Sequence, residues 1–161
     1  MRENEKYSEA YELIKKGYQY QKRGRISAAI KTYRKSLKIL PTAEAHTFLG
    51  WAFSLQGRYD KAIEECYRAI DLDEDYGNPY NDLGYYFTIY KRYDEAMEWL
   101  IKAINAPRYE ERHLAYYNLG KIYELKGDWF KAVEYYYQSY QINTSFMEGS
   151  DATLRLQGVL N

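Results

Sequence analysis

The stretch Tyr116-Tyr-Asn-Leu-Gly120-Lys-Ile-Tyr123 sets one glycine among large side chains. Tyr116 precedes the glycine by four residues and Tyr123 follows it by three, so all three fall on one face of an α-helix. A glycine on such a face lets a second helix approach closely. The octet therefore predicts one member of a tightly packed helix pair.

The same arrangement recurs along the chain at intervals of 33, 34 and 36 residues. The central glycines are Gly17, Gly50, Gly84 and Gly120. An aromatic residue follows three positions later, at Tyr20, Phe53, Phe87 and Tyr123. An alanine follows twelve positions after each glycine, at Ala29, Ala62, Ala96 and Ala132. A period of this length is typical of helix hairpins that stack on their neighbours.

The turn inside each predicted hairpin falls at Gly24, Gly57, Lys91 and Gly127. Glycine suits the left-handed conformation that commonly ends a helix. Lys91 departs from this pattern, so we expect a turn there that is either strained or remodelled.

A bulky residue, then Leu-Gly, an aromatic residue and an alanine resemble the signature of the tetratricopeptide repeat. The resemblance covers residues 10 to about 146 and implies an all-α fold, a right-handed α-solenoid of antiparallel helix hairpins. The expected repeats span about 10–42, 43–76, 77–110 and 111–146. An N-terminal extension (1–9) precedes them, and a C-terminal capping helix (147–161) follows, with Ser150 or Asp151 as its N-cap.

The composition argues against several other classes of protein. The 161 residues carry no net charge, and the single cysteine, Cys66, cannot form an internal disulfide or a thiolate metal site. The N-terminal residues are charged and lack the apolar core of a signal peptide. No stretch has the apolar length of a membrane span. We therefore expect a cytoplasmic protein.

No catalytic motif is present: the chain has no phosphate-binding loop, dinucleotide-binding glycines or zinc-protease signature. His46 occupies the bulky slot that Tyr80 and Tyr116 fill in other repeats, so we expect a packed core histidine. We expect His113 at the surface and Cys66 in the core. The sequence predicts no enzyme, no cofactor and no metal site.

In tetratricopeptide proteins the first helices line a concave face, and the residue after the repeat glycine points into it. This resemblance gives a candidate partner-binding groove rich in aromatic side chains, which provide large contact area at little entropic cost. The candidate residues are Ile14, Tyr18, Thr47, Trp51, Leu55, Asn81, Tyr85, Thr88, Tyr117 and Lys121. We expect a non-enzymatic scaffold or adaptor that holds a protein or peptide segment there. The alternative is that these rings, Trp51 above all, pack against neighbouring helices.

Some tetratricopeptide proteins grip the C-terminal carboxylate of chaperones with a clamp of Lys, Arg and Asn. The matching positions here do not carry that pattern; they are Ile14, Tyr18, Phe48, Asn78 and Asp82. The Pro107-Arg-Tyr109 connection looks something like that of the type IV pilus pilotins, which are lipoproteins. Because the lipidated cysteine of the pilotins is not found in this sequence, we do not adopt that assignment.

The charge is neutral only in sum, because residues 1–41 carry a net +7 and the remainder a net −7. Four cations fall on one outward side of the second helix of the first repeat: Lys31, Arg34, Lys35 and Lys38. A solvated face is one interpretation of this basic patch. An alternative function is binding to nucleic acid or to an anionic surface. Another is a self-assembling structural adaptor, with copies joined through terminal repeats.

Overall fold

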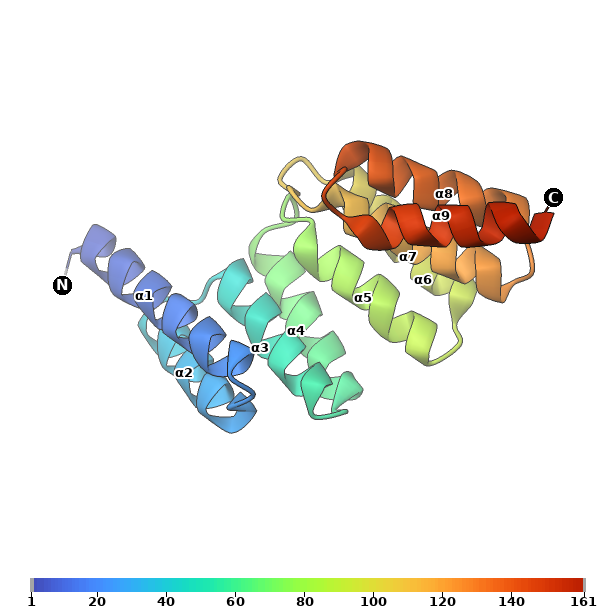
Figure 1. Cartoon of the computed structure of the whole chain (residues 1–161). Coiled ribbons are helices and arrows are strands. Elements are labelled where there is room, and N and C mark those ends of the chain that lie inside the picture. Colours follow the sequence, from blue (N-terminus) through green and yellow to red (C-terminus); the bar gives the residue numbers. More distant parts are fainter. Residues whose placement is uncertain (1, 161) are drawn as a thin grey trace. The chain divides into compact units, whose positions relative to one another are not determined.

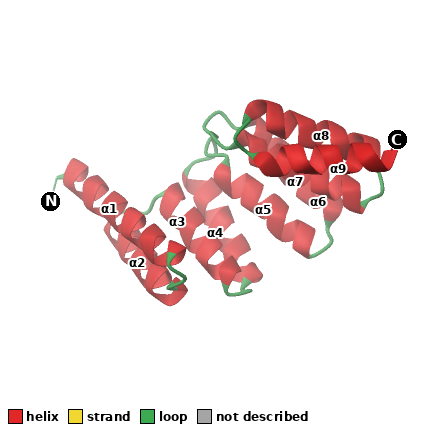
Figure 2. Cartoon of the chain, in the orientation of Figure 1, coloured by secondary structure: helices red, strands yellow, loops and turns green. Residues whose placement is uncertain are grey.

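The computed structural model describes residues 2–160, and over that range it contains nine helices and no strand (Figures 1 and 2). The helices are α1 (Glu3–Lys22), α2 (Ile26–Ile39), α3 (Ala43–Leu55), α4 (Tyr59–Leu72), α5 (Asn78–Ile89), α6 (Tyr93–Asn105), α7 (Arg112–Leu125), α8 (Trp129–Ile142) and α9 (Met147–Leu160). The all-α class expected from the sequence is confirmed. Within the described range no helix is both long enough and apolar enough to cross a membrane.

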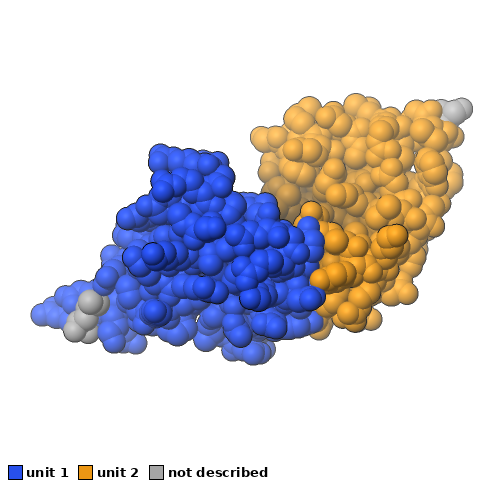
Figure 3. All heavy atoms as spheres, turned by 90° about the horizontal axis from the view of Figure 1, so that it is seen from below, with its two compact units in different colours: residues 1–79 blue, residues 80–161 orange. Residues whose placement is uncertain are grey.

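Successive helices pair into hairpins, and the chain divides into two compact units, residues 1–79 and 80–161 (Figure 3). Unit 1 holds the hairpins α1–α2 and α3–α4, with α2 also packed on α3. Unit 2 holds most of α5, then α6, the hairpin α7–α8 and α9, which packs on α8. The boundary falls in the first turn of α5.

The repeat glycines lie where the two helices of a hairpin come closest. A Cβ atom built on Gly17 would overlap the ring of Tyr33, and one on Gly84 would overlap Leu100. On Gly120 it would lie 2.6 Å from Cδ1 of Tyr136. At these three positions a side chain of the partner helix fills the space that a Cβ atom would occupy, which explains why the residue is glycine.

Hydroxyl groups join the two helices of the first and fourth hairpins. Ser36 Oγ donates to the carbonyl of Ala10 (2.8 Å), and the Tyr33 hydroxyl donates to Gln21 Oε1 (3.0 Å). In the fourth hairpin Ser139 Oγ donates to the carbonyl of His113 (2.7 Å), and the Tyr136 hydroxyl donates to Glu124 (2.8 Å). The second and third hairpins carry fully buried, smaller or apolar residues at these positions: Cys66, Ala69, Leu100 and Ala103.

The hairpin turns are left-handed, with φ of 72° at Gly24 and Gly57 and 79° at Gly127. Lys91 adopts the same conformation, with φ of 59°. The turn hydrogen bond is kept, since the backbone N–H of Arg92 donates to the carbonyl of Phe87 at 2.9 Å. Of the two expected outcomes at Lys91, the structure therefore shows the strained turn.

Helix reaches further toward the N-terminus than the sequence pattern indicated, whereas α9 falls within the expected capping segment, 147–161. α1 begins at Glu3, so helix runs through most of the segment expected to precede the first repeat. α9 begins at Met147, and the expectation that Ser150 or Asp151 is its N-cap is wrong because both lie inside the helix. In the first turn of this helix Gly149 packs directly on the backbone of α8, where its Cβ would lie 3.2 Å from the Tyr136 carbonyl.

Candidate partner-binding surface

Three rings of unit 1 form an aromatic cluster on α1 and α3. The ring centroids of Tyr18 and Phe48 are 5.7 Å apart, and Trp51 lies 6.2 Å from each of them. Phe48 also stacks on the buried Tyr33 at 5.7 Å. Trp51 remains 40% exposed, and Leu55, one turn further along α3, is also exposed. We call Tyr18, Phe48, Trp51 and Leu55 the unit 1 aromatic surface.

Unit 2 carries its own aromatic residues on α5 and α7. Tyr85 is 42% exposed and meets Tyr86 edge-on at 5.8 Å. Tyr117 lies 5.2 Å from the rings of both Tyr136 and Phe146, and the Lys121 ammonium sits 5.8 Å from the centre of the Tyr117 ring. We call Tyr85, Tyr117 and Lys121 the unit 2 aromatic surface.

These rings are both packed and partly exposed. The rings do pack against neighbouring side chains, as the alternative proposed. Trp51 and Tyr85 nevertheless expose about two fifths of their surface. A ring whose underside is fixed by packing loses little entropy when its open edge binds a partner. The arrangement is thus compatible with recognition.

Three predicted groove residues are buried instead. Ile14, Thr47 and Asn81 are 5%, 6% and 8% exposed, so the expectation that their side chains are open to a partner is wrong. Thr47 donates its hydroxyl to the carbonyl of Ala43, and Asn81 accepts from the Asn118 amide at 3.0 Å. Thr88 is half-buried, and its hydroxyl donates to the Gly84 carbonyl.

Phe48 is the residue of the unit 1 aromatic surface that the sequence interpretation did not include. It stands two positions before the repeat glycine, and the corresponding residues of the other repeats are Lys15, Asp82 and Asn118. An aromatic ring among polar equivalents was the available signal.

Asp82, one turn before Tyr85 on α5, is an acid in an unfavourable environment. Burial raises the pKa of its carboxyl group to about 7, and the charge of Glu111 adds to this effect, while a hydrogen bond from Asn81 opposes it. A carboxyl group with this pKa is partly protonated at neutral pH. The charge beside the unit 2 aromatic surface therefore depends on pH near neutrality.

Neither histidine lies in a site with catalytic geometry. His46 is largely buried, as expected, but its Nδ1 lies 2.5 Å from Oε2 of Glu65, which also pairs with Arg68. His113 is half-buried rather than at the surface; its ring lies 5.0 Å from Phe146, and burial lowers its pKa. Cys66 is buried, as expected. Among residues 2–160, no cluster of three or more His, Cys, Asp or Glu side chains could hold a metal ion.

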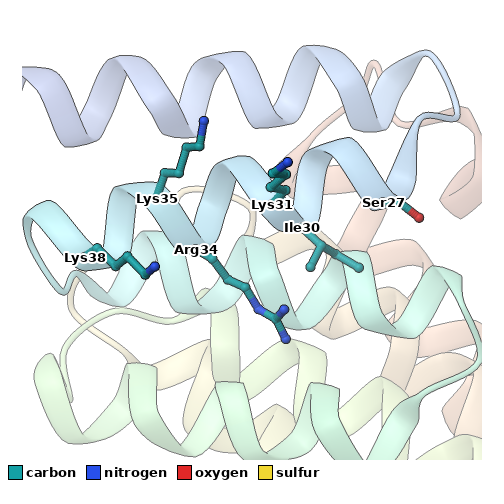
Figure 4. Close-up of a pocket in the computed structure, with 6 residues that line it drawn as sticks. All are labelled: Ser27, Ile30, Lys31, Arg34, Lys35 and Lys38. Carbon is teal, nitrogen blue, oxygen red and sulfur yellow. The ribbon is translucent and has the colours of Figure 1, made fainter.

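The predicted basic patch is real and shapes a hollow. Lys31, Arg34, Lys35 and Lys38 are all exposed and, together with Ser27 and Ile30, line a space of about 390 Å³ beside α2 (Figure 4). The Arg34 guanidinium lies 5.8 Å from the centre of the Phe53 ring on α3.

Three stretches of the chain match family models of the tetratricopeptide repeat: residues 13–42, 43–76 and 115–144. The chain belongs to the tetratricopeptide repeat family, and its hairpins are those of the helical solenoids that this family forms. A comparison with curated proteins gives no significant match.

Several solved structures share the fold. PilF of Pseudomonas aeruginosa is 28% identical, with a TM-score of 0.85 over 94% of this chain and 68% of that chain. MamA is 27% identical, with a TM-score of 0.68 over 87% of this chain and 81% of that chain. PilW, described as a type IV pilus biogenesis factor, is 19% identical, with a TM-score of 0.82 over 93% and 69% of the two chains. The PilW likeness shows the fold alone.

Proposed function

We propose that this protein is a non-enzymatic scaffold that holds a segment of a partner protein against its first-helix aromatic residues. The observation that carries the proposal is the state of Trp51 and Tyr85, whose rings are fixed by aromatic neighbours yet remain about two fifths exposed. Tetratricopeptide arrays generally act as binding scaffolds, which agrees with this proposal but does not name the partner.

The chemistry of each surface, taken by itself, indicates what a partner segment would bring. Trp51 and Leu55 offer apolar contact, so a segment would supply apolar side chains to unit 1. In unit 2 the Lys121 ammonium stands above the Tyr117 ring, where a carboxylate or a backbone carbonyl could accept a hydrogen bond. Apolar side chains therefore match unit 1, and an acidic or carbonyl group matches unit 2.

The test is affinity purification from the source cells with wild-type protein and a Trp51→Ala, Tyr85→Ala double variant. We expect proteins captured by the wild type to be lost or reduced about tenfold with the variant, since large aromatic anchors dominate binding energy at interfaces. The matched control is Phe130→Ala, Tyr137→Ala, which removes two exposed rings from α8. Equal losses in both variants, or none in either, would contradict the proposal.

A further inference from the structure

The outer face of α2 carries a cluster of positive charges that no carboxylate in the described range neutralises. Figure 4 shows Lys31, Arg34, Lys35 and Lys38 projecting from this one helix around the hollow that Ser27 and Ile30 complete. α2 contains no acidic residue, and within the described part of the chain none of the four cations forms an ion pair with a carboxylate. Like charges one helical turn apart destabilise a helix.

The repeat fold does not require these cations. Counting from the repeat alanine of each second helix, the position of Lys31 is occupied by Glu64, Glu98 and Glu134 in the other three hairpins. The position of Lys38 is occupied by Asp71, Asn105 and Gln141. The second helices of the other three hairpins therefore all carry an acid where α2 carries Lys31. A face that is only solvated does not require this change from negative to positive charge.

We propose that this hollow on α2 is a second docking site, which binds an acidic polypeptide segment of a partner. Charge complementarity is the basis: four cations without a carboxylate partner stand around one hollow of about 390 Å³, which can accept several carboxylates. The Ser27 hydroxyl adds a donor for a backbone carbonyl at one end of the row. The site is separate from the aromatic surfaces on the first helices.

The dimensions of the site suit an extended chain. Lys31 and Lys38 are separated by seven residues, which is about 10 Å along a helix. Alternate side chains of an extended peptide that point the same way are about 7 Å apart. Two successive carboxylates of a segment with an acid at every second residue therefore fit within the span of the four cations.

The lining of the hollow favours polypeptide over the other anionic partners. Single-stranded nucleic acid is held by aromatic rings that stack on its bases, and no aromatic residue lines this hollow; Phe53, under Arg34, is buried. A membrane surface is held by exposed apolar side chains beside the cations. Ile30 is the apolar residue of the lining, and it is buried.

The experiment measures fluorescence anisotropy of a fluorescein-labelled peptide of about eight alternating Glu and Ser residues, which is longer than the span of the cations and can therefore cover all four. Wild-type protein is expected to bind it at low ionic strength, and less tightly as salt is added. A Lys31→Glu, Lys35→Glu variant should bind at least about fivefold more weakly, since two attractive pairs become repulsive. Glutamate is native at the position of Lys31 in the other hairpins, so the helix should still form, which circular dichroism can verify.

The matched control is Lys6→Glu, Lys61→Glu, which changes the net charge of the same unit by the same amount at residues that do not line the hollow. It should bind the peptide within about twofold of the wild type, because neither lysine lines the hollow. Equal weakening in both variants, or no binding by the wild type, would overturn the proposal. Tighter binding of an oligouridine RNA or of phosphatidylserine vesicles than of the peptide, abolished by the α2 variant, would overturn it too and assign the site to that other anion.

Discussion

Lys91 holds a backbone conformation that its side chain disfavours. The equivalent turns use glycine at Gly24, Gly57 and Gly127, all with positive φ, and Lys91 reaches 59° without that freedom. The left-handed region costs an ordinary L-residue roughly 1–2 kcal/mol because Cβ crowds the backbone. The third hairpin therefore carries local strain that the other turns avoid.

Replacing Lys91 with glycine should stabilise the protein. The expected gain in the free energy of unfolding is about 1 kcal/mol, since relief of strain exceeds the added freedom of glycine in the unfolded chain. Urea denaturation followed by circular dichroism measures it. The reverse change, Gly57→Lys, is the control: a Cβ there meets no atom within 4 Å, so only the backbone conformation opposes it. Stabilisation by both substitutions would show that backbone strain is not the cause.

Asp82 should make stability depend on pH in an unusual direction. Its folded pKa, about 7, lies above the ordinary carboxyl value, so between about pH 4 and pH 7 the folded state holds a proton that the unfolded state has released. Its contribution to stability is therefore present at low pH and is lost as pH rises through 7.

The Asp82→Asn variant tests this coupling, because asparagine is similar in shape and does not titrate. At pH 8 we expect the variant to be more stable than the wild type by about 1–3 kcal/mol, and near pH 4 the two should be similar. Urea unfolding of both proteins at the two pH values gives the comparison. If the wild type instead became more stable relative to the variant as pH rises, the fold would be stabilising the carboxylate, which would contradict this prediction.

At the scale of the element, the two helices of the α7–α8 pair can approach closely because Gly120 has no Cβ atom. A methyl group on Gly120 would lie 2.6 Å from the Tyr136 ring, whose hydroxyl is tied to Glu124. A ring held at both ends cannot move aside without breaking that bond. The α7–α8 pair is therefore intolerant of even alanine at this position.

Gly120→Ala should lower the free energy of unfolding by roughly 2 kcal/mol, the usual effect of overpacking a core. The control is Gly158→Ala in α9, where the added Cβ meets nothing within 4 Å. That change should be neutral or stabilising by about 0.5 kcal/mol, because alanine is the better helix former. Thermal unfolding of both variants distinguishes steric overlap from helix propensity, and similar midpoints would contradict a steric role for Gly120.

α9 closes the last hairpin by a mixture of apolar and ionic contact. Ala152 and Leu156 pack on Ala132 and Tyr136. The Arg155 guanidinium donates to both carboxylate oxygens of Glu124, at 2.7 and 2.9 Å, and this bond lowers the pKa of Glu124. The helix α9 therefore packs on α8 through apolar side chains and is also bonded to α7 through the Arg155–Glu124 ion pair.

At the scale of the whole molecule, a chain ending at Phe146 should lose stability mainly in unit 2. Removing α9 eliminates the contacts of Leu156 and exposes the Tyr136 ring. Together these losses should lower the free energy of unfolding by about 3 kcal/mol or more. Hydrogen exchange should show lower protection in α8, while amides of α2 serve as an internal reference. A chain that lacks only residues 158–161 keeps Leu156 and Arg155 and should behave like the wild type. Unchanged protection of α8 in the longer deletion would contradict a capping role.

The fold could be predicted from the sequence because the repeat signal is periodic. Gly17, Gly84 and Gly120 each meet the large side chain that lies sixteen residues further on, and this spacing is visible in one dimension. The strain at Lys91 was equally visible as a break in a glycine pattern. Such features depend on one hairpin only, so they do not require knowledge of how neighbours pack.

The candidate site could be predicted only in part, because exposure depends on neighbouring helices. Trp51 and Tyr85 are open as expected, whereas Asn81 is covered by Asn118, which lies 37 residues away. The pairing of His46 with Glu65 likewise joins different helices through side-chain orientation. Periodicity shows which face a residue occupies, but it does not fix how deeply that face is covered.

The hydroxyl-mediated bonds of the first and fourth hairpins bear on how such arrays can be engineered. Links inside a hairpin, such as Ser36 to Ala10 and Ser139 to His113, hold its two helices together independently of the neighbours that stack on it. A designer who wishes to lengthen this protein should therefore duplicate α3–α4, which holds the buried Cys66 and Ala69 where the first and fourth hairpins hold hydrogen-bonding side chains, and keep those two hairpins outside the duplicated pair.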